Sequence, residues 1–484
     1  SDGIVRHIGG IVTMNKTFKV VWSKAKQCYV VVSEVAKNHS GKKKIVVASV
    51  LAALMVGSGA VVSEVGAEKN HPGTGANTSV AWGTDSSAMG TNSVAIGKGA
   101  TSSGQESLAV GYGTEASGIR SVSVGLNTKA TDSDAIAIGY DTSAEARGSF
   151  AIGRNAHAHL EYTTVIGYNV KADTNASGAT LIGYTSTNKG NQAVGIGSNV
   201  TVGENAGGAV AIGYMTTVTG QAGIAIGSNG TNASETRTIA VGNTATASAV
   251  GGTAIGTNTN VSGTDSFAAG SSATVSGTSS TAVGHGATAS GETSLALGRK
   301  AAAAAKNTVA VGTSATSSEE NAISIGTNAQ AKKTGTTAVG ANTQATKESD
   351  SVFGISSIAS GGQSTAIGNS VTTSGNQSFG AGTSTTVSGA TSVGIGNGAT
   401  VSGASSVGIG NGSQATNENT IAVGTTANAS NKNATAIGNT ATASGIGSLA
   451  LGKGANSTAN DTVAAGTSSS ATGVSSAAIR HGAS

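Results

Sequence analysis

Apolar positions recur along this chain with a period of fourteen residues. The stretch 94–111, VAIGKGATSSGQESLAVG, opens with Val-Ala-Ile-Gly and closes, fourteen residues later, with Leu-Ala-Val-Gly. With this glycine as a phase marker, the pattern occurs 28 times from Gly83 to Gly466, and 24 of the 27 intervals are fourteen residues long. The three longer intervals end at Gly183, Gly213 and Gly242, and their one or two additional residues predict enlarged turns. Such a period indicates an array in which each repeat forms one coil.

Each coil has room for two short strands and two tight turns. In the strand before the marker glycine, the residues one and three positions back are large and apolar or β-branched, and the residue between them is Ala, Gly or Ser in 25 of 28 coils. Side chains alternate between the two faces of a strand, so neither face of this first strand is polar. The second strand has one polar face, as where Thr246 and Ser248 alternate with Ala245 and Ala247. We therefore expect an all-β fold, a parallel β-roll of two sheets.

A strand with two apolar faces is buried on both sides. We expect the large face to fill the interior of the roll and the small face to pack against another copy of the chain, with the reverse assignment as the alternative. Either assignment predicts an oligomer. The expected interior residues are Val94, Ile96, Leu108, Val110, Phe150 and Ile152, and the expected interface residues are Ala95, Ala109, Ala254, Ala282, Ala310 and Ala338.

The first part of the chain does not share the repeat. Three lysines at 42–44 precede an apolar run at 45–56, and small residues follow, which is typical of a secretory signal peptide cleaved after Ala60 or Ala67. The apolar run is too short to span a bilayer comfortably. The expected divisions are upstream sequence at 1–13, an extended signal peptide at 14–67, a lead-in at 68–79 and the repeats at 80–484.

Removal of the signal peptide changes the charge of the protein. Residues 1–67 hold nine Lys and Arg against three Asp and Glu, so the remainder has 18 against 20 and is slightly acidic. Nucleic-acid binding, which usually needs a basic surface, therefore has no support. The sole cysteine, Cys28, leaves with the signal, so we expect the exported protein to contain no disulfide.

Two segments resemble known families. The run MNKTFKVVWSKAKQCYVVVSEVAKNHSGKKK from residue 14 resembles the extended signal peptide of type V secreted proteins, and the repeats, most fully at 92–97, resemble the YadA-like head of trimeric autotransporter adhesins. This resemblance implies a left-handed β-roll, a homotrimer, and display on the outer membrane of a Gram-negative cell. Arg480 takes the marker position after Gly466, and no neck, stalk or membrane anchor follows it. We therefore expect a fragment of a longer adhesin.

Motifs for catalysis are not found. Neither a phosphate-binding GxxxxGK[ST] loop nor a recurring Ser/His/Asp group or GGxGxD calcium repeat is present, so we expect no enzyme and no cofactor. His157 and His159 share one face of a strand, a spacing that could suit a metal. Because Ala156 and Ala158 occupy the inward phase, we expect both histidines to lie in solvent without a carboxylate partner, and we expect no metal site.

Adhesion is the function that the resemblance implies. The ligand would be a host matrix protein of the collagen or fibronectin class, a host cell surface, or the same protein on a sister bacterium, as in autoagglutination and biofilm formation. Repetition along a rod makes weak contacts multivalent. An ice-binding or purely structural solenoid is the alternative, although the outward positions mix Thr, Ser, Asn, Lys and Glu and form no regular threonine ladder.

Tyrosines mark one candidate binding surface. Five of the seven directly follow a marker glycine, and equal phase predicts that they stack along one edge of the roll. Tyrosine joins a rigid apolar ring to a polar tip and is frequent at binding surfaces. Alternatively, the rings only cover turns. The candidate ligand-binding residues are Tyr112, Tyr140, Tyr168, Tyr184 and Tyr214.

Overall fold

The computed structural model describes residues 18–23, 28–33, 78–173 and 175–483, and the chain divides into two units, 1–67 and 68–484. In the first unit, β1 (Phe18–Ser23) and β2 (Cys28–Ser33) pair as antiparallel strands. The apolar run of the predicted signal and both predicted cleavage sites lie outside the described residues.

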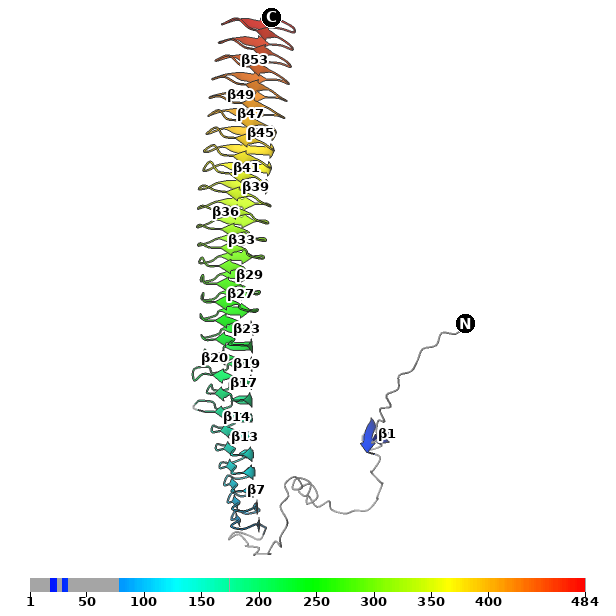
Figure 1. Cartoon of the computed structure of the whole chain (residues 1–484), viewed down its shortest axis with the longest axis vertical. Helices are drawn as coiled ribbons and strands as arrows, with labels where there is room; N and C mark the ends of the chain where they lie inside the picture. The colour runs from blue at the N-terminus through cyan, green and yellow to red at the C-terminus, as the bar shows by residue number, and fades with distance from the viewer. Residues whose placement is uncertain (1–17, 24–27, 34–77, 174, 484) are drawn as a thin grey trace, which may run out of the picture. The chain divides into compact units, whose positions relative to one another are not determined.

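The second unit is a solenoid of stacked coils, and its described residues form strands and turns without a helix (Figure 1). This confirms the predicted all-β class. Two strands, β13 (Phe150–Ala158) and β14 (Thr164–Ala172), run through both sheets and connect them. The first-sheet strands of the first ten coils are otherwise β3 (Val80–Trp82), β5 (Val94–Ile96), β7 (Leu108–Tyr112), β9 (Val122–Leu126), β11 (Ile136–Tyr140), β15 (Thr180–Tyr184), β17 (Val194–Ser198) and β19 (Val210–Tyr214). The second-sheet strands are β4 (Ser87–Ala88), β6 (Thr101–Ser102), β8 (Glu115–Ala116), β10 (Lys129–Ala130), β12 (Ser143–Ala144), β16 (Thr187–Asn188), β18 (Thr201–Val202) and β20 (Thr217–Val218).

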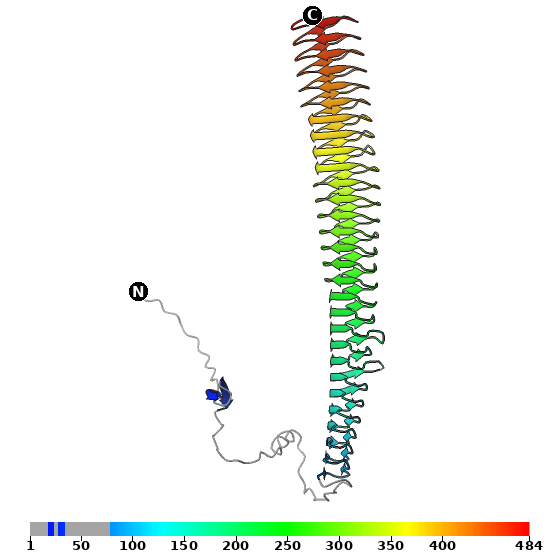
Figure 2. The ribbon, with the colours of Figure 1, turned by 180° about the vertical axis from the view of Figure 1, so that it is seen from behind.

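Every strand of the roll pairs in parallel with the equivalent strand of the next coil. Val94 lies opposite Leu108, which lies opposite Val122, so equal phase in the sequence becomes one column in space. The same pattern continues from β21 (Ile224–Ser228) to β57 (Ala477–Ile479), and Figure 2 shows it as an uninterrupted ladder. Constant coil length explains this register, because each coil returns the chain to the same point one strand spacing further on.

The structure reverses the preferred assignment of the two faces. The small residues fill the roll: Ala95, Ala109, Ala254, Ala282, Ala310 and Ala338 are all 0% exposed within a single chain. The large residues expected in the interior, Val94, Ile96, Leu108, Val110, Phe150 and Ile152, lie on the outer face and are only partly buried. The prediction was wrong because the interior is so narrow that alanine of the first sheet, packed against alanine or valine of the second, already fills it.

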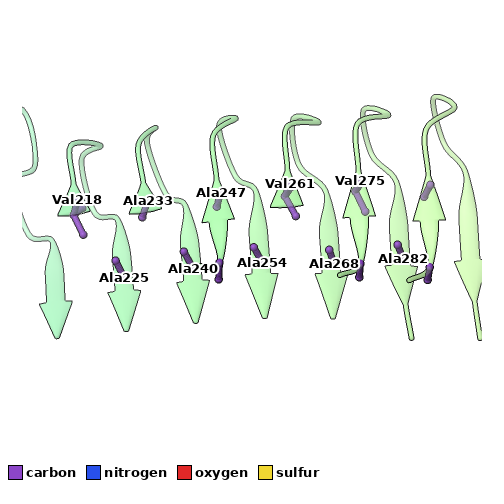
Figure 3. Close-up of a cluster of buried hydrophobic side chains, with 14 of the residues drawn as sticks. Val218, Ala225, Ala233, Ala240, Ala247, Ala254, Val261, Ala268, Val275 and Ala282 are labelled. Carbon is purple, nitrogen blue, oxygen red and sulfur yellow. The ribbon is translucent and has the colours of Figure 1, made fainter. Parts of the chain in front are cut away.

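Interior volumes are matched between the two sheets. In Figure 3, Ala225, Ala240 and Ala268 of the first sheet point toward Val218, Ala233 and Val261 of the second. Where the inward-facing residue of the second sheet is valine, the inward-facing residue of the first sheet can be glycine. A Cβ on Gly394 would lie 2.5 Å from a methyl of Val387, and one on Gly408 would lie 2.5 Å from a methyl of Val401. Close packing therefore restricts the size of the side chain at both positions.

Residues in the left-handed region close the turns. Asn328 and Asn342, two positions after their marker glycines, have φ of 55° and 57°. Asparagine adopts this region more readily than most residues. The Nδ2 of Asn328 also donates to Oδ1 of Asn342 at 3.1 Å. One turn position thus favours polar residues and links successive coils.

The longer repeats produce enlarged turns, as predicted. In the interval that ends at Gly213, two consecutive turns are closed by bonds from Ala206 N–H to Gly203 O and from Ala209 N–H to Ala206 O, at 3.2 Å each. Wider turns stand out near β20 in Figure 1. The insertions leave the strand register unchanged, because Gly197 still lies opposite Gly213.

Candidate ligand-binding edge of the roll

The five candidate tyrosines form one column, as their phase predicted. Strand pairing places Tyr112 opposite Leu126, which lies opposite Tyr140. Arg154 then separates Tyr140 from Tyr168. Tyr184 lies directly opposite Tyr168, and one serine separates it from Tyr214. We call this set of five residues the tyrosine column.

Cations lie between and beside the rings. The guanidinium of Arg154 is 5.1 Å from the ring centroid of Tyr140 and 5.7 Å from that of Tyr168. Lys98 Nζ lies 5.9 Å from the ring centroid of Tyr112. Such contacts are attractive because the ring face is electron-rich. Sequence reasoning missed both cations, although each directly follows a marker glycine and so shares the phase of the column.

Two of the five rings stack on each other, and all five remain accessible. Tyr168 and Tyr184 stack with centroids 5.1 Å apart and planes 12° apart. The five side chains are between 40% and 54% exposed. Stacking limits the rotamers that Tyr168 and Tyr184 can adopt, so a ligand that binds these two rings would meet side chains with less conformational entropy to lose.

Histidines 157 and 159 are placed differently from the prediction. They lie on the outer face, because Ala156 and Ala158 are fully buried, but both are partly buried themselves. They line an open groove of about 420 Å³ together with Asp141 and Glu145. The expected absence of a neighbouring carboxylate is therefore wrong. Coil stacking explains the error, since residues a whole coil apart in sequence become neighbours.

The surroundings of the groove shift the pKa of one histidine, His157. Burial lowers the pKa of His157, and the adjacent His159 lowers it further, whereas the carboxylates of Asp141 and Glu145 act in the opposite direction. Desolvation disfavours the charged imidazolium. The neutral ring is thus the preferred form of His157 near neutral pH.

The large residues of the first sheet form an apolar stripe on the outside of the chain. Such a continuous row of partly exposed aliphatic residues is typical of a surface that another protein covers. Among its most exposed members are Ile255, Leu297, Ile325, Ile395, Ile409, Ile437 and Leu451, between 37% and 45% exposed. We call this row the aliphatic stripe.

Other chemistry is sparse in the described part of the chain. No three His, Cys, Asp or Glu side chains there are already grouped around a common point. None of these residues form a helix that could span a membrane. That the protein is not an enzyme stays a prediction.

Comparison with known families matches both parts of the chain. Residues 14–63 match the extended signal peptide of the type V secretion system. The YadA head domain repeat matches residues 88–114, 116–142, 144–169, 203–229, 233–259, 262–287, 289–315, 317–343, 345–370, 402–427 and 429–455, which together make up more than half of the chain. A comparison with curated proteins returned no match. With its secretion signal and its solenoid of fourteen-residue coils, the chain belongs to the YadA head repeat family and matches a trimeric autotransporter adhesin.

Proposed function

We propose that this protein is the adhesive head of a trimeric autotransporter on the outer membrane, and that the tyrosine column contacts the ligand. The family supports display on a Gram-negative cell surface and a role in adhesion. The observation that carries the site is the column itself, a row of exposed aromatic rings in which Tyr168 and Tyr184 stack and Arg154 lies between Tyr140 and Tyr168. The ligands proposed are matrix proteins of the collagen or fibronectin class, host cells, or a sister cell.

Trimer formation is part of the proposal. The aliphatic stripe runs along the first sheet, and no other part of the chain that the structure describes covers it. Burial of apolar surface contributes about 25 cal/mol per Å², and the stripe repeats with every coil, so small gains accumulate along the rod. In a trimer, the three chains would bury their aliphatic stripes against one another around a common axis.

A trimer would also multiply the adhesive contacts. Alternate positions in the column, Tyr112, Tyr140 and Tyr168, lie two coils apart, which is about 10 Å at the usual strand spacing. Three chains would carry three such rows. Several weak contacts made together give an avidity well above that of any single contact.

Substitution of the column tests the proposal. Changing all five tyrosines to serine should abolish binding to immobilised collagen, fibronectin or host cells, because the rings supply the contact area. Circular dichroism and sedimentation should stay unchanged. Adhesion at the original level would refute the assignment of the site.

A matched control is available on the same rod. Tyr162 is 57% exposed and stands five residues before Gly167, outside the column. Changing Tyr162 to serine removes an equally accessible ring and should leave adhesion unchanged. Equal losses in the control and the fivefold variant would show that the column has no special role.

A further inference from the structure

Two imidazole nitrogens converge on one hydroxyl group in the groove beside β12 and β13. Ser143 Oγ lies 2.9 Å from Nδ1 of His157 and 3.3 Å from Nε2 of His159. The ring centroids are 5.6 Å apart and the rings meet edge to face. Two ring nitrogens that point to one small region could share a cation there, since Zn²⁺ binds histidine nitrogen at about 2.0–2.1 Å.

A carboxylate lies within reach of the pair. Ala144 pairs with Ala158, and Glu145 N–H donates to Ala158 O at 3.0 Å, so Glu145 lies one coil before His159. Neighbouring strands are about 4.8 Å apart, and the exposed Glu145 side chain has room to turn toward the imidazoles. Asp173 follows one coil after His159, but its carboxylate is bound to Lys171 Nζ at 2.6 Å. Of these two carboxylates Glu145 is therefore the better third ligand, and Asp141 lines the same groove.

We propose that His157, His159 and Glu145 bind a divalent transition-metal ion, with Zn²⁺ as the representative ion and water completing its coordination. Two imidazoles and one carboxylate suit Zn²⁺, Ni²⁺ or Cu²⁺, whereas Ca²⁺ and Mg²⁺ prefer oxygen ligands throughout. The site is incomplete until Glu145 turns inward, and Lys129 and Lys171 line the same groove. Both features weaken the binding, so the ion exchanges readily with solution.

The site is independent of the tyrosine column. Its ligands come from the second sheet and the turn after it, while the tyrosines follow the marker glycines at the end of the first sheet. A trimer would carry three copies. Loss of metal binding and loss of adhesion are thus separable results.

Isothermal titration calorimetry tests the proposal, with zinc chloride added to the purified full chain. We expect one saturable site per chain that the double change of His157 and His159 to threonine removes. Threonine occurs at outward positions of this sheet, as at Thr187, so the variant should keep its circular dichroism spectrum. Glu145→Gln should weaken the affinity at least several-fold, and calcium chloride should give no saturable heat.

A control histidine distinguishes the pair from an isolated ring. His285 is exposed and directly follows Gly284, with no second histidine beside it. Changing His285 to glutamine should leave the zinc isotherm unchanged. Zinc binding that survives in the double threonine variant, or no saturable binding by the unaltered chain, would overturn the proposal.

A spectroscopic measurement checks the ligands directly. Bound Cu²⁺ should show electron paramagnetic resonance couplings to nitrogen from two imidazoles, and the single change of His159 to threonine should reduce them to one. A spectrum without imidazole nitrogen in the unaltered chain would contradict the assignment even if some metal binds.

Discussion

Gly312 stacks on Gly326 of the next coil so closely that no side chain fits between them. A Cβ on Gly312 would lie 2.5 Å from the carbonyl oxygen of Gly326, and the φ of Gly312 is +127°. Both the stacking and the backbone angle require glycine at this position. The marker glycine is thus the residue that allows the first strand to turn while its neighbours remain at strand spacing.

Changing Gly312 to alanine should therefore destabilise its coil and the two beside it. Backbone strain and the close contact together predict a loss of about 2–5 kcal/mol. Because long repeat arrays do not unfold in one step, hydrogen exchange measured by mass spectrometry over residues 298–340 is the suitable readout. Unchanged protection there would contradict this account of the marker glycine.

A second glycine provides the control for that experiment. Gly398 has φ of +68°, and an added Cβ would meet no atom within 4 Å. It occupies the position that Asn328 and Asn342 fill in other coils. Changing Gly398 to asparagine should alter stability by no more than about 0.5 kcal/mol, measured by the same exchange experiment.

An introduced charge should have different effects on the inner and the outer face of the first-sheet strands. Ala338 is fully buried within one chain, so Ala338→Glu should disrupt the roll itself and reduce the β-sheet signal in circular dichroism. Ile395 belongs to the aliphatic stripe and is 38% exposed. Ile395→Glu should keep that signal but shift sedimentation toward smaller species. The opposite pair of results would restore the original assignment of the faces.

Asp350 should be important for the turn that it occupies. It is fully buried, and its Oδ1 accepts bonds from Gly362 N–H at 2.9 Å and from the N–H and hydroxyl of Ser364 at 3.0 and 2.7 Å. Its Oδ2 accepts a bond from Lys347 N–H at 2.9 Å. Changing Asp350 to alanine removes the acceptor of the three N–H groups, which predicts a loss of about 1–3 kcal/mol. Thermal unfolding of the two proteins compares their stability.

A serine control separates hydrogen bonding from charge at this turn. Equivalent positions of neighbouring coils hold Thr336 and Ser364. Asp350→Ser keeps an acceptor of the type that those coils use, so it should be less destabilising than the alanine change. Equal losses with alanine and serine would show that a serine hydroxyl does not replace the carboxylate as the acceptor at this turn.

The fourteen-residue period is enough to predict the length of the coil, the strand register and the tyrosine column. Each follows from one physical fact: in a parallel stack with a constant number of residues per coil, equal phase means the same column. For this reason the sequence pattern alone predicts that Tyr140 and Tyr168 lie on one edge of the roll. The insertions were also predictable, since added residues within an unchanged register can only enlarge a turn.

Which face lies inside the roll, and which side chains meet across coils, depends on packing between the two sheets. Ala95 and Val94 belong to faces that are both apolar, so periodicity could not distinguish the interior from the outer surface; the narrow space between the sheets did. Likewise, Ser143 and His159 are sixteen residues apart and differ in phase, so their contact depends on the direction of the two side chains. The width of the roll and the packing of individual side chains arise from contacts between sheets and coils, and these are not local properties of the sequence.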